Sequence, residues 1–290
     1  MRYGVAIELN ANEEDGSAAD EVSAYVSSDS WGRVEMGDQD GAADRMFVAA
    51  EDILAGRAGF DGDAENYINA GNGLIAPDMT ISSDDTKLIY FTPRFSGFQL
   101  GASLTPDSGV NGRAVGETDN DGDRENIWEI AANWKGDFGD AGVVVSAFYE
   151  GGTDETGAAE AEDVEIFGVG ATVEFGGFAV GAGYTDLGEG GLSQAQITAS
   201  RDNGKWYNIG VAYGTGPWKV SACYFTSEIN ATDTDFYTVN ATYQVAPGWN
   251  LLADVNFVSI DNQNGGGGTT GAAQLKNDYT ELLVTNQFKF

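Results

Sequence analysis

Some residue types are scarce in this sequence, and each scarcity excludes a class of protein. There is no histidine and only one cysteine, Cys223. Without histidine, the commonest general base, a Ser–His catalytic pair and the usual zinc site are excluded. One cysteine cannot build an intramolecular disulfide framework. No run approaches the roughly 18 consecutive apolar residues of a membrane helix, and no basic start followed by an apolar stretch marks a signal peptide.

Basic residues are also few. Lys and Arg number 14 against 46 Asp and Glu, which gives a formal net charge of −32. Phosphate binding needs a basic face, so we expect no nucleic-acid partner. Aromatic residues make up 11%, too many for a disordered acidic chain. The 41 glycines are about twice the usual share.

Short runs of alternating apolar and polar residues fill most of the chain. In the first run Tyr3, Val5, Ile7 and Leu9 fall on one face. The runs are roughly 7–13 residues long, near the roughly 9–11 of a tilted membrane-spanning strand. Their connections alternate between short turns and long polar loops. A soluble sandwich also alternates along its strands but does not usually sort its connections in this way. We therefore predict an all-β fold, a transmembrane antiparallel β-barrel with about 14 strands visible.

The two faces of these predicted strands differ in chemistry. The apolar face carries aromatic residues near the strand ends, where membrane barrels place girdles at the headgroup boundary. The other face is rich in Asn, Gln, Ser, Thr and Glu, which would make a poor dry core and suit a water-filled lumen. The girdle candidates are Tyr3, Tyr149, Tyr184, Tyr213, Trp218, Tyr224, Tyr237, Tyr243, Trp249 and Phe290.

One segment, Asp38 to Asp84, breaks the alternation. It is rich in Gly, Asp and Ala, with one short helix-like piece around Met46–Leu54. A connection of this length is normally functional or disordered, and this one carries too many apolar residues for a disordered linker. We predict that it folds into the lumen of the barrel and narrows it. A surface excursion between two strands is the alternative.

Two motifs resemble the Gram-negative general porins, and more closely those of the alphaproteobacterial type. They are WGRVEMGDQDGAADRM (Trp31–Met46), where a strand runs into the long segment, and the hairpin YFTPRFSGFQLGASLTPD (Tyr90–Asp107). The terminal aromatic strand ending in Phe290 also fits, since that last Phe resembles a signal for outer-membrane assembly. The resemblance spans the whole chain as a pattern of strands and loops.

The resemblance implies a 16-stranded barrel that assembles as a trimer and whose third long loop folds inside. It implies a single barrel domain over residues 1–290, with residues 38–84 as the constriction loop. The family pattern places that loop after the fifth strand, whereas here it follows the third visible strand. We therefore expect the signal peptide and the first two strands to be missing, as a mis-assigned start codon at Met1 would produce.

The resemblance also implies a constriction where loop carboxylates face basic residues of the wall. Opposed charges across a narrow aqueous gap set a transverse field that a polar solute can align with. The alternative for each acid is that it is merely solvated. The loop acids are Glu51, Asp52, Asp61, Asp63, Glu65 and Asp78, and the candidate wall cations are Arg2, Arg33, Lys87 and Arg94.

No cofactor is expected, but one loop carries a weak divalent-cation pattern. Asp119, Asp121 and Asp123 alternate around Gly122, like half of a calcium loop. No bidentate Glu stands at the twelfth position, so this is no EF-hand. A flexible acidic loop is the alternative to a Ca²⁺ site.

Together these patterns predict passive diffusion of small hydrophilic solutes and ions through an outer-membrane pore, with no enzymatic activity. The excess of acid predicts cation preference. The expected partners are the lipid bilayer, lipopolysaccharide and two further copies of the chain in a homotrimer. A substrate-specific outer-membrane channel and a secreted soluble β-protein or adhesin remain as alternatives.

Overall fold

The structure is a computed structural model that describes residues 1–9, 19, 21–56, 81–108, 124–154, 162–193, 197–198, 203–229, 232–262 and 275–289. In these residues the elements are, in chain order, β1 (Arg2–Ile7), β2 (Val22–Ser28), β3 (Gly32–Asp38), α1 (Ala42–Met46), η1 (Glu51–Ile53), β4 (Thr86–Phe91), β5 (Phe98–Asp107), β6 (Arg124–Phe138), β7 (Ala141–Asp154), β8 (Val164–Phe175), β9 (Phe178–Asp186), β10 (Lys205–Thr215), β11 (Trp218–Ile229), β12 (Thr232–Ala246), β13 (Trp249–Asn262) and β14 (Leu275–Phe288).

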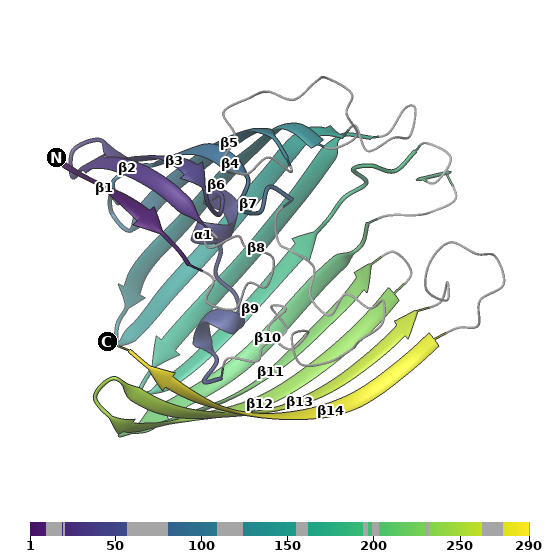
Figure 1. Cartoon of the computed structure of the whole chain (residues 1–290). Coiled ribbons are helices and arrows are strands. Elements are labelled where there is room, and N and C mark those ends of the chain that lie inside the picture. The colour runs from purple at the N-terminus through teal and green to yellow at the C-terminus, as the bar shows by residue number, and fades with distance from the viewer. Residues whose placement is uncertain are drawn as a thin grey trace.

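The strands form one antiparallel sheet in which each pairs with its neighbours in sequence, from β1 to β14. Figure 1 shows this sheet curving round like the wall of a barrel, with α1 and η1 inside the curve. Tight turns join the strands at one end; between β8 and β9 the turn is Gly176-Gly177, both with positive φ. Within the described residues no pairing joins β1 to β14.

Period two separates an apolar outer face from a largely polar inner one. On β10 and β12, Ile209 and Val239 are 54% and 53% exposed, while their neighbours Asn208 and Asn240 are buried. On β6, Glu129 is buried and Ile130 is exposed. A soluble β-protein would bury the aliphatic side chains in its core and expose the amide side chains to water. The opposite arrangement here matches a membrane barrel and confirms the predicted fold class.

Aromatic residues pair across neighbouring strands on the outer face. Toward the long-loop end, Trp128 stacks on Tyr149 at 5.4 Å between ring centroids, and Tyr224 stacks on Tyr237 at 4.6 Å. The pairs at the short-turn end include Phe178–Tyr213, Trp218–Tyr243 and Trp249–Phe288. These two bands have the placement of interfacial girdles.

No helix in the described part of the chain has the length and apolar character needed to cross a membrane.

Candidate functional site

Residues 41–56, which we call the inner segment, lie against the inward face of the sheet. Its α1 packs on β4, β5, β6 and β7, and its η1 packs on β9 and β10. Figure 1 shows both elements within the curve of the barrel. The expected helix over Met46–Leu54 is wrong in its bounds. After Met46 the chain turns extended at Phe47 (φ −67°, ψ 148°), and only Glu51–Ile53 forms a short 3₁₀ turn.

Glycines on the wall make room for the inner segment. A Cβ on Gly170 would overlap the carbonyl oxygen of Val48. One on Gly181 would lie 2.8 Å from the oxygen of Ala49 and 2.9 Å from Cα of Ala50. Any larger residue at these two inward positions would displace the segment from the wall.

Side chains of β5 and β6, one of them the charged Glu129, hold the first half of the inner segment. The first N–H groups of a helix have no partner within it, and here the wall supplies two acceptors. Ala42 N–H donates to Ser103 Oγ (3.2 Å) and Ala43 N–H donates to Glu129 Oε2 (2.7 Å). The other carboxylate oxygen of Glu129 accepts the hydroxyl of Ser82 (2.6 Å). Each half of this carboxylate therefore fixes one end of the long segment.

Lys87 binds the two ends of the long segment to each other. Its ammonium donates to the carbonyl oxygens of Gln39 (2.5 Å), Ser82 (3.2 Å) and Ser83. The side chain is 1% exposed, so its charge does not face the open bore. Lys87, a predicted wall cation, therefore lies on the wall with its charge enclosed by these carbonyls. Sequence spacing could not show that the backbone carbonyls would surround it.

Neutral side chains hold most of the second half. Asn208 accepts the N–H of Ala50 and donates to Glu51, and Ser221 accepts the N–H of Ala55. Lys219 is the only charged wall group among these contacts in the described residues. The bonds are Val48 N–H to Ser146 Oγ (2.9 Å), Ala50 N–H to Asn208 Oδ1 (3.1 Å), Asn208 Nδ2 to Glu51 Oε2 (2.9 Å), Ala55 N–H to Ser221 Oγ (2.8 Å), Lys219 Nζ to the Leu54 carbonyl (3.0 Å) and Thr242 Oγ1 to the Ala55 carbonyl.

An apolar cluster fills the bore between the inner segment and part of the wall. Phe47 packs edge-on against Phe148 (5.3 Å between centroids) and Trp206 (6.0 Å). Trp206 in turn lies 5.8 Å from Phe225. The sequence pattern suggested an inward face that is polar throughout. The structure shows instead that part of this face is apolar. Behind the segment it is a dry core, and this packing stabilises the segment.

The predicted loop acids divide between described and undescribed residues. Glu51 and Asp52 lie in η1, and Asp52 accepts the N–H of Ala49 (2.8 Å). The remaining predicted acids lie outside the described residues, as does the proposed divalent site. These are Asp61, Asp63, Glu65 and Asp78, and then Asp119, Asp121 and Asp123.

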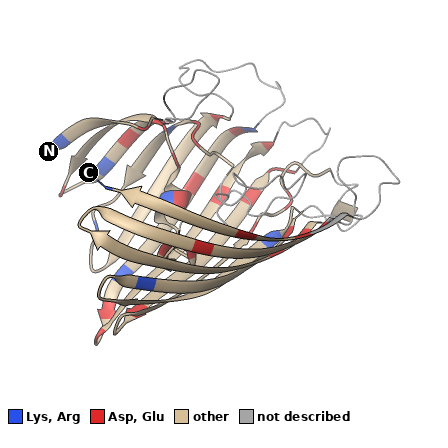
Figure 2. Cartoon of the chain, turned by 60° about the horizontal axis from the view of Figure 1, so that its bottom comes forward, with Lys and Arg blue, Asp and Glu red and all other residues tan. Residues whose placement is uncertain are grey.

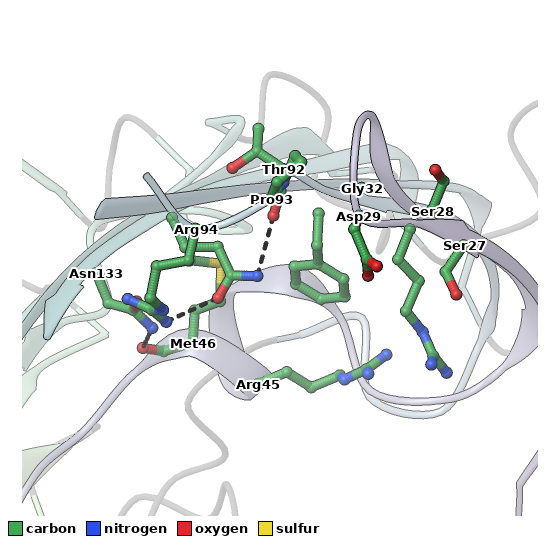
Figure 3. Close-up of a pocket in the computed structure, with 13 residues that line it drawn as sticks. Ser27, Ser28, Asp29, Gly32, Arg45, Met46, Thr92, Pro93, Arg94 and Asn133 are labelled. Atoms are coloured by element: carbon green, nitrogen blue, oxygen red, sulfur yellow. Dashed lines mark hydrogen bonds between the residues drawn. The ribbon is translucent and has the colours of Figure 1, made fainter. Parts of the chain in front are cut away.

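Of the three remaining predicted wall cations, one lies on β1 and two line a common cavity. Arg2 is exposed on β1. Arg33 and Arg94 line one cavity together with Arg45, which the sequence reasoning missed (Figure 3). Ala42, Ala43 and Met46 of α1 are buried while Arg45 is exposed. Helical spacing over Ala42–Met46 would have placed Arg45 on the free face, had that helix been predicted.

Three carboxylates gather where the long segment leaves and rejoins the sheet. Glu21, Asp40 and Asp84 each offer an oxygen within 4.8 Å of the others. Burial and the neighbouring charges of Asp40 and Asp84 raise the pKa of Glu21. Burial, Asp40 and Glu129 raise the pKa of Asp44 to about 7. Carboxylate oxygens suit hard cations such as Ca²⁺, but this geometry by itself assigns no metal.

Comparison with known proteins gives one family. The sequence profile described as Gram-negative porin matches residues 1–265. An uncharacterized protein of Rickettsia bellii (strain RML369-C) is 24% identical over 296 residues, which cover 78% of this chain and 67% of that protein.

Solved structures share the fold. A porin refined at 1.8 Å resolution aligns with a TM-score of 0.55 and 19% identity, covering 93% of this chain and 81% of the other. The anion-selective porin from Comamonas acidovorans aligns with a TM-score of 0.60 and 15% identity, covering 98% and 82%. At these identities the likeness concerns the fold alone.

Proposed function

This chain belongs to the Gram-negative porin family and is an outer-membrane porin channel, and we propose that residues 38–84 narrow it into a cation-preferring pore. Small hydrophilic solutes and ions cross it by passive diffusion through a water-filled passage. The family is one of channels and not of enzymes, so no catalytic role is assigned to the acids of the bore.

The anchoring of the inner segment is the observation that carries this proposal. Between Ala42 and Ala55 its backbone donates to side chains on β5, β6, β7, β10 and β11. These strands lie on different sides of the curve in Figure 1, so a segment bonded to all of them occupies part of the bore's cross-section. Since the segment is held by its backbone, it stays fixed whichever solute passes.

The balance of charge supports cation preference. The chain carries 46 acids against 14 bases, and in Figure 2 red acidic segments recur from strand to strand. Acidic groups around a pore lower the potential for cations and raise it for anions. The anion-selective Comamonas porin has the same fold, so the fold does not fix the sign of selectivity. We therefore assign the sign from the charges of this chain.

The outer face supports the proposed partners. Apolar side chains cover the outward positions of the strands, for example Val5 and Leu282, both 67% exposed. Such a surface needs lipid or protein against it, because water around it is unfavourable. We propose that the bilayer, lipopolysaccharide and two further copies of this chain supply that contact in a homotrimer.

Planar-bilayer recording tests the proposal. Protein refolded in detergent is inserted, and the reversal potential is measured in a KCl gradient. We expect K⁺ to be preferred over Cl⁻; a reversal potential of the opposite sign would refute the cation preference. A variant in which a short Gly-Ser linker replaces residues 57–80 is expected to conduct more and to admit larger polyethylene glycols. If this variant and the unmodified protein had the same conductance and excluded the same polymers, residues 38–84 would not constrict the pore.

A substrate-specific channel is the second candidate function. The observation that favours it is the cavity lined by Arg33, Arg45 and Arg94, because a guanidinium binds solutes with an anionic group more tightly than other solutes.

A further inference from the structure

A groove of about 610 Å³ lies on the outer face of the sheet and crosses β6, β7, β8 and β9. Aromatic side chains bound it, with Phe98 and Trp134 at one end and Tyr184 at the other. Its floor consists of outward-facing alanines, which rise less from the sheet than the side chains around them. These are Ala132, Ala147, Ala171 and Ala182. We call this feature the outer groove.

The register of four strands builds the floor of the outer groove. Ala132 lies opposite Ala147, and Ala171 lies opposite Ala182. Val145, which lies opposite Ala171, joins the two pairs. From β6 to β9 there are three strand spacings of roughly 4.8 Å, so the floor is about 14 Å long. The groove is therefore long and narrow.

The lining of the outer groove offers nothing to a polar occupant. Asn133 and Ser146 contribute backbone to it, while their side chains point into the bore and bond the inner segment. The indole N–H of Trp134 already donates to the Ser96 carbonyl (3.2 Å), and the hydroxyl of Tyr184 donates to a carboxylate on its own strand (3.0 Å). A polar group in the groove would lose its hydrogen bonds to water and gain none. A hydrocarbon chain loses nothing there.

The outer groove is continuous with the apolar belt that faces the membrane. Ile130 on β6 and Val180 on β9 flank it and are 55% and 48% exposed. In a barrel of this kind the outward apolar belt lies in the hydrocarbon of the bilayer. An empty groove would deprive its lining of dispersion contacts, so a lipid chain fills it.

The position of the outer groove along the strands selects one leaflet. Ala132, Ala147 and Ala171 lie nearer to the short-turn end of their strands than to the long-loop end, and Ala182 lies midway. The short turns of such barrels face the periplasm. The groove therefore lies mainly in the periplasmic leaflet, whose lipids are phospholipids.

A second copy of this chain fits the outer groove less well. The barrel wall is convex, so two walls meet along a line and leave a recess unfilled unless a large side chain enters it. More exposed apolar side chains lie at the two edges of the sheet, such as Val5 on β1 and Leu282 on β14, both 67% exposed. A neighbouring copy has more apolar surface to cover at those edges.

We propose that the outer groove holds one acyl chain of a phospholipid of the periplasmic leaflet. This inference rests on the outer-membrane placement of the proposed function and adds a lipid-binding site outside the bore. The other face of β6, β7 and β9 carries the inner segment. A chain held in the groove supports the wall directly behind that segment.

Native mass spectrometry of the refolded protein, released from detergent micelles, tests the proposal. The probes are dipalmitoyl and dihexanoyl phosphatidylethanolamine, which share a headgroup and differ in the length of their chains. We expect the unmodified protein to retain the dipalmitoyl lipid and not the dihexanoyl lipid. Ala147→Phe and Ala171→Phe each fill part of the floor and are expected to lower the retained fraction at least fivefold.

Ala222→Phe is the matched control. Ala222 is an exposed, outward-facing alanine on β11, outside the groove lining. Retention that is unchanged in this variant and lowered in the groove variants supports the proposal. Equal retention in all variants, or equal retention of the two lipids, would overturn it. Fewer oligomers in the groove variants with unchanged lipid retention would also overturn it, because a second copy would then occupy the groove.

Tryptophan quenching is a second measurement that leaves the floor of the groove unaltered. Trp128 and Trp134 lie three residues to either side of Ala131, the middle residue of β6, so their depths in the two leaflets are similar. Trp128 is 41% exposed and Trp134 is half-buried. In vesicles of phospholipid with brominated chains, we expect Trp134→Phe to remove more of the quenching than Trp128→Phe. The opposite order would follow from exposure alone and would overturn the proposal.

Neither measurement depends on conduction, so the two proposals fail separately. A protein that retains the lipid and does not conduct would refute the diffusion function alone. A protein that conducts and shows neither selective retention nor the expected order of quenching would refute the groove assignment alone.

Discussion

The two halves of the inner segment are held in the same bore by different chemistry. Around α1 two charged groups take part: Glu129 accepts a backbone N–H, and Lys87 binds the carbonyls at both ends of the long segment. Ser103 and Asn133 add neutral contacts there. Around η1 most are neutral, with Asn208 and Ser221 as the main acceptors. Glycines of β8 and β9 bring the backbone of the second half directly onto the wall.

This difference indicates how each half can be released. A buried charge is costly to leave without its partner, so the first half is fixed by a few groups whose loss is severe. A neutral hydrogen bond contributes about 1 kcal/mol net, so the second half depends on the sum of several modest contacts and on close packing. Charge and pH should therefore act mainly on the α1 half, and changes of volume mainly on the η1 half.

The largest effect is expected from Lys87→Met. The carbonyls of Gln39, Ser82 and Ser83 lose their shared donor, and Glu129 loses a nearby positive charge. Breaking a buried charged contact typically costs about 3–5 kcal/mol. Urea unfolding in lipid vesicles measures the loss, with Lys135→Met as the exposed control, expected to change stability by under about 0.5 kcal/mol. Similar losses in the two variants would contradict the role assigned to Lys87.

Gly170→Ala is expected to displace the second half. The new methyl group overlaps the Val48 carbonyl, and overpacking of this kind costs about 1–3 kcal/mol. The matched control is Gly214→Ala, also on the bore side, where the nearest atom to the new Cβ is the Trp218 carbonyl oxygen at 3.9 Å. We expect a changed single-channel conductance in the first variant and not in the second. An unaltered Gly170→Ala channel would show that the segment does not touch the wall there.

Asn208→Ala removes the best-connected neutral contact. The N–H of Ala50 and the carboxylate of Glu51 each lose a partner, which should cost about 1–2 kcal/mol. Asn208→Asp sharpens the comparison, because it keeps an acceptor for Ala50 and sets a second carboxylate against Glu51. We expect Asn208→Asp to be less stable than Asn208→Ala at neutral pH, because two like-charged carboxylates then face each other. Equal stability of the two variants would argue against the Asn208–Glu51 contact.

The effect confined to the smallest part of the molecule is expected from pH at the α1 half. In the folded state the Asp44 pKa stands at about 7, above its ordinary 3.8. Between these values the folded chain binds more protons than the unfolded one, so stability falls as the pH rises from about 4 to about 7. Amide hydrogen exchange in α1, corrected for intrinsic rate, should be slower at pH 5 than at pH 8. Asp44→Asn should remove this difference, and a difference that persists would assign it to another group.

The sequence predicted the barrel well because strand alternation is a local property. Runs such as Tyr3–Leu9 and Phe98–Leu104 show period two without knowledge of any partner, and the structure places their apolar residues outward. Alternating loop lengths then order the hairpins. The inner surface was predicted less well: Phe148, Trp206 and Phe225 point inward and form a dry cluster with Phe47, which no polar-inside rule anticipates.

The candidate site could be predicted only in part. Arg33 and Arg94 were identified as wall cations, while Arg45 was missed because the short helix was expected four residues too late. Lys87 was identified by its face and not by its surroundings, since the three carbonyls that surround it come from the two ends of a long connection. Sequence reasoning assigns a residue to a face but cannot measure what lies opposite it.

The sequence by itself determined that the strands alternate, that their outer face is apolar and that acidic residues outnumber basic ones. The first two are properties of neighbouring residues, and the third is a property of the composition. Tertiary structure alone decided which cations remain exposed and which are enclosed by the protein. Lys87 and Arg45 are 42 residues apart in the chain. Lys87 is buried and Arg45 is exposed because of where the backbone folds back across the bore. Distances across a barrel are set by its closure and packing, and neither can be read along a strand.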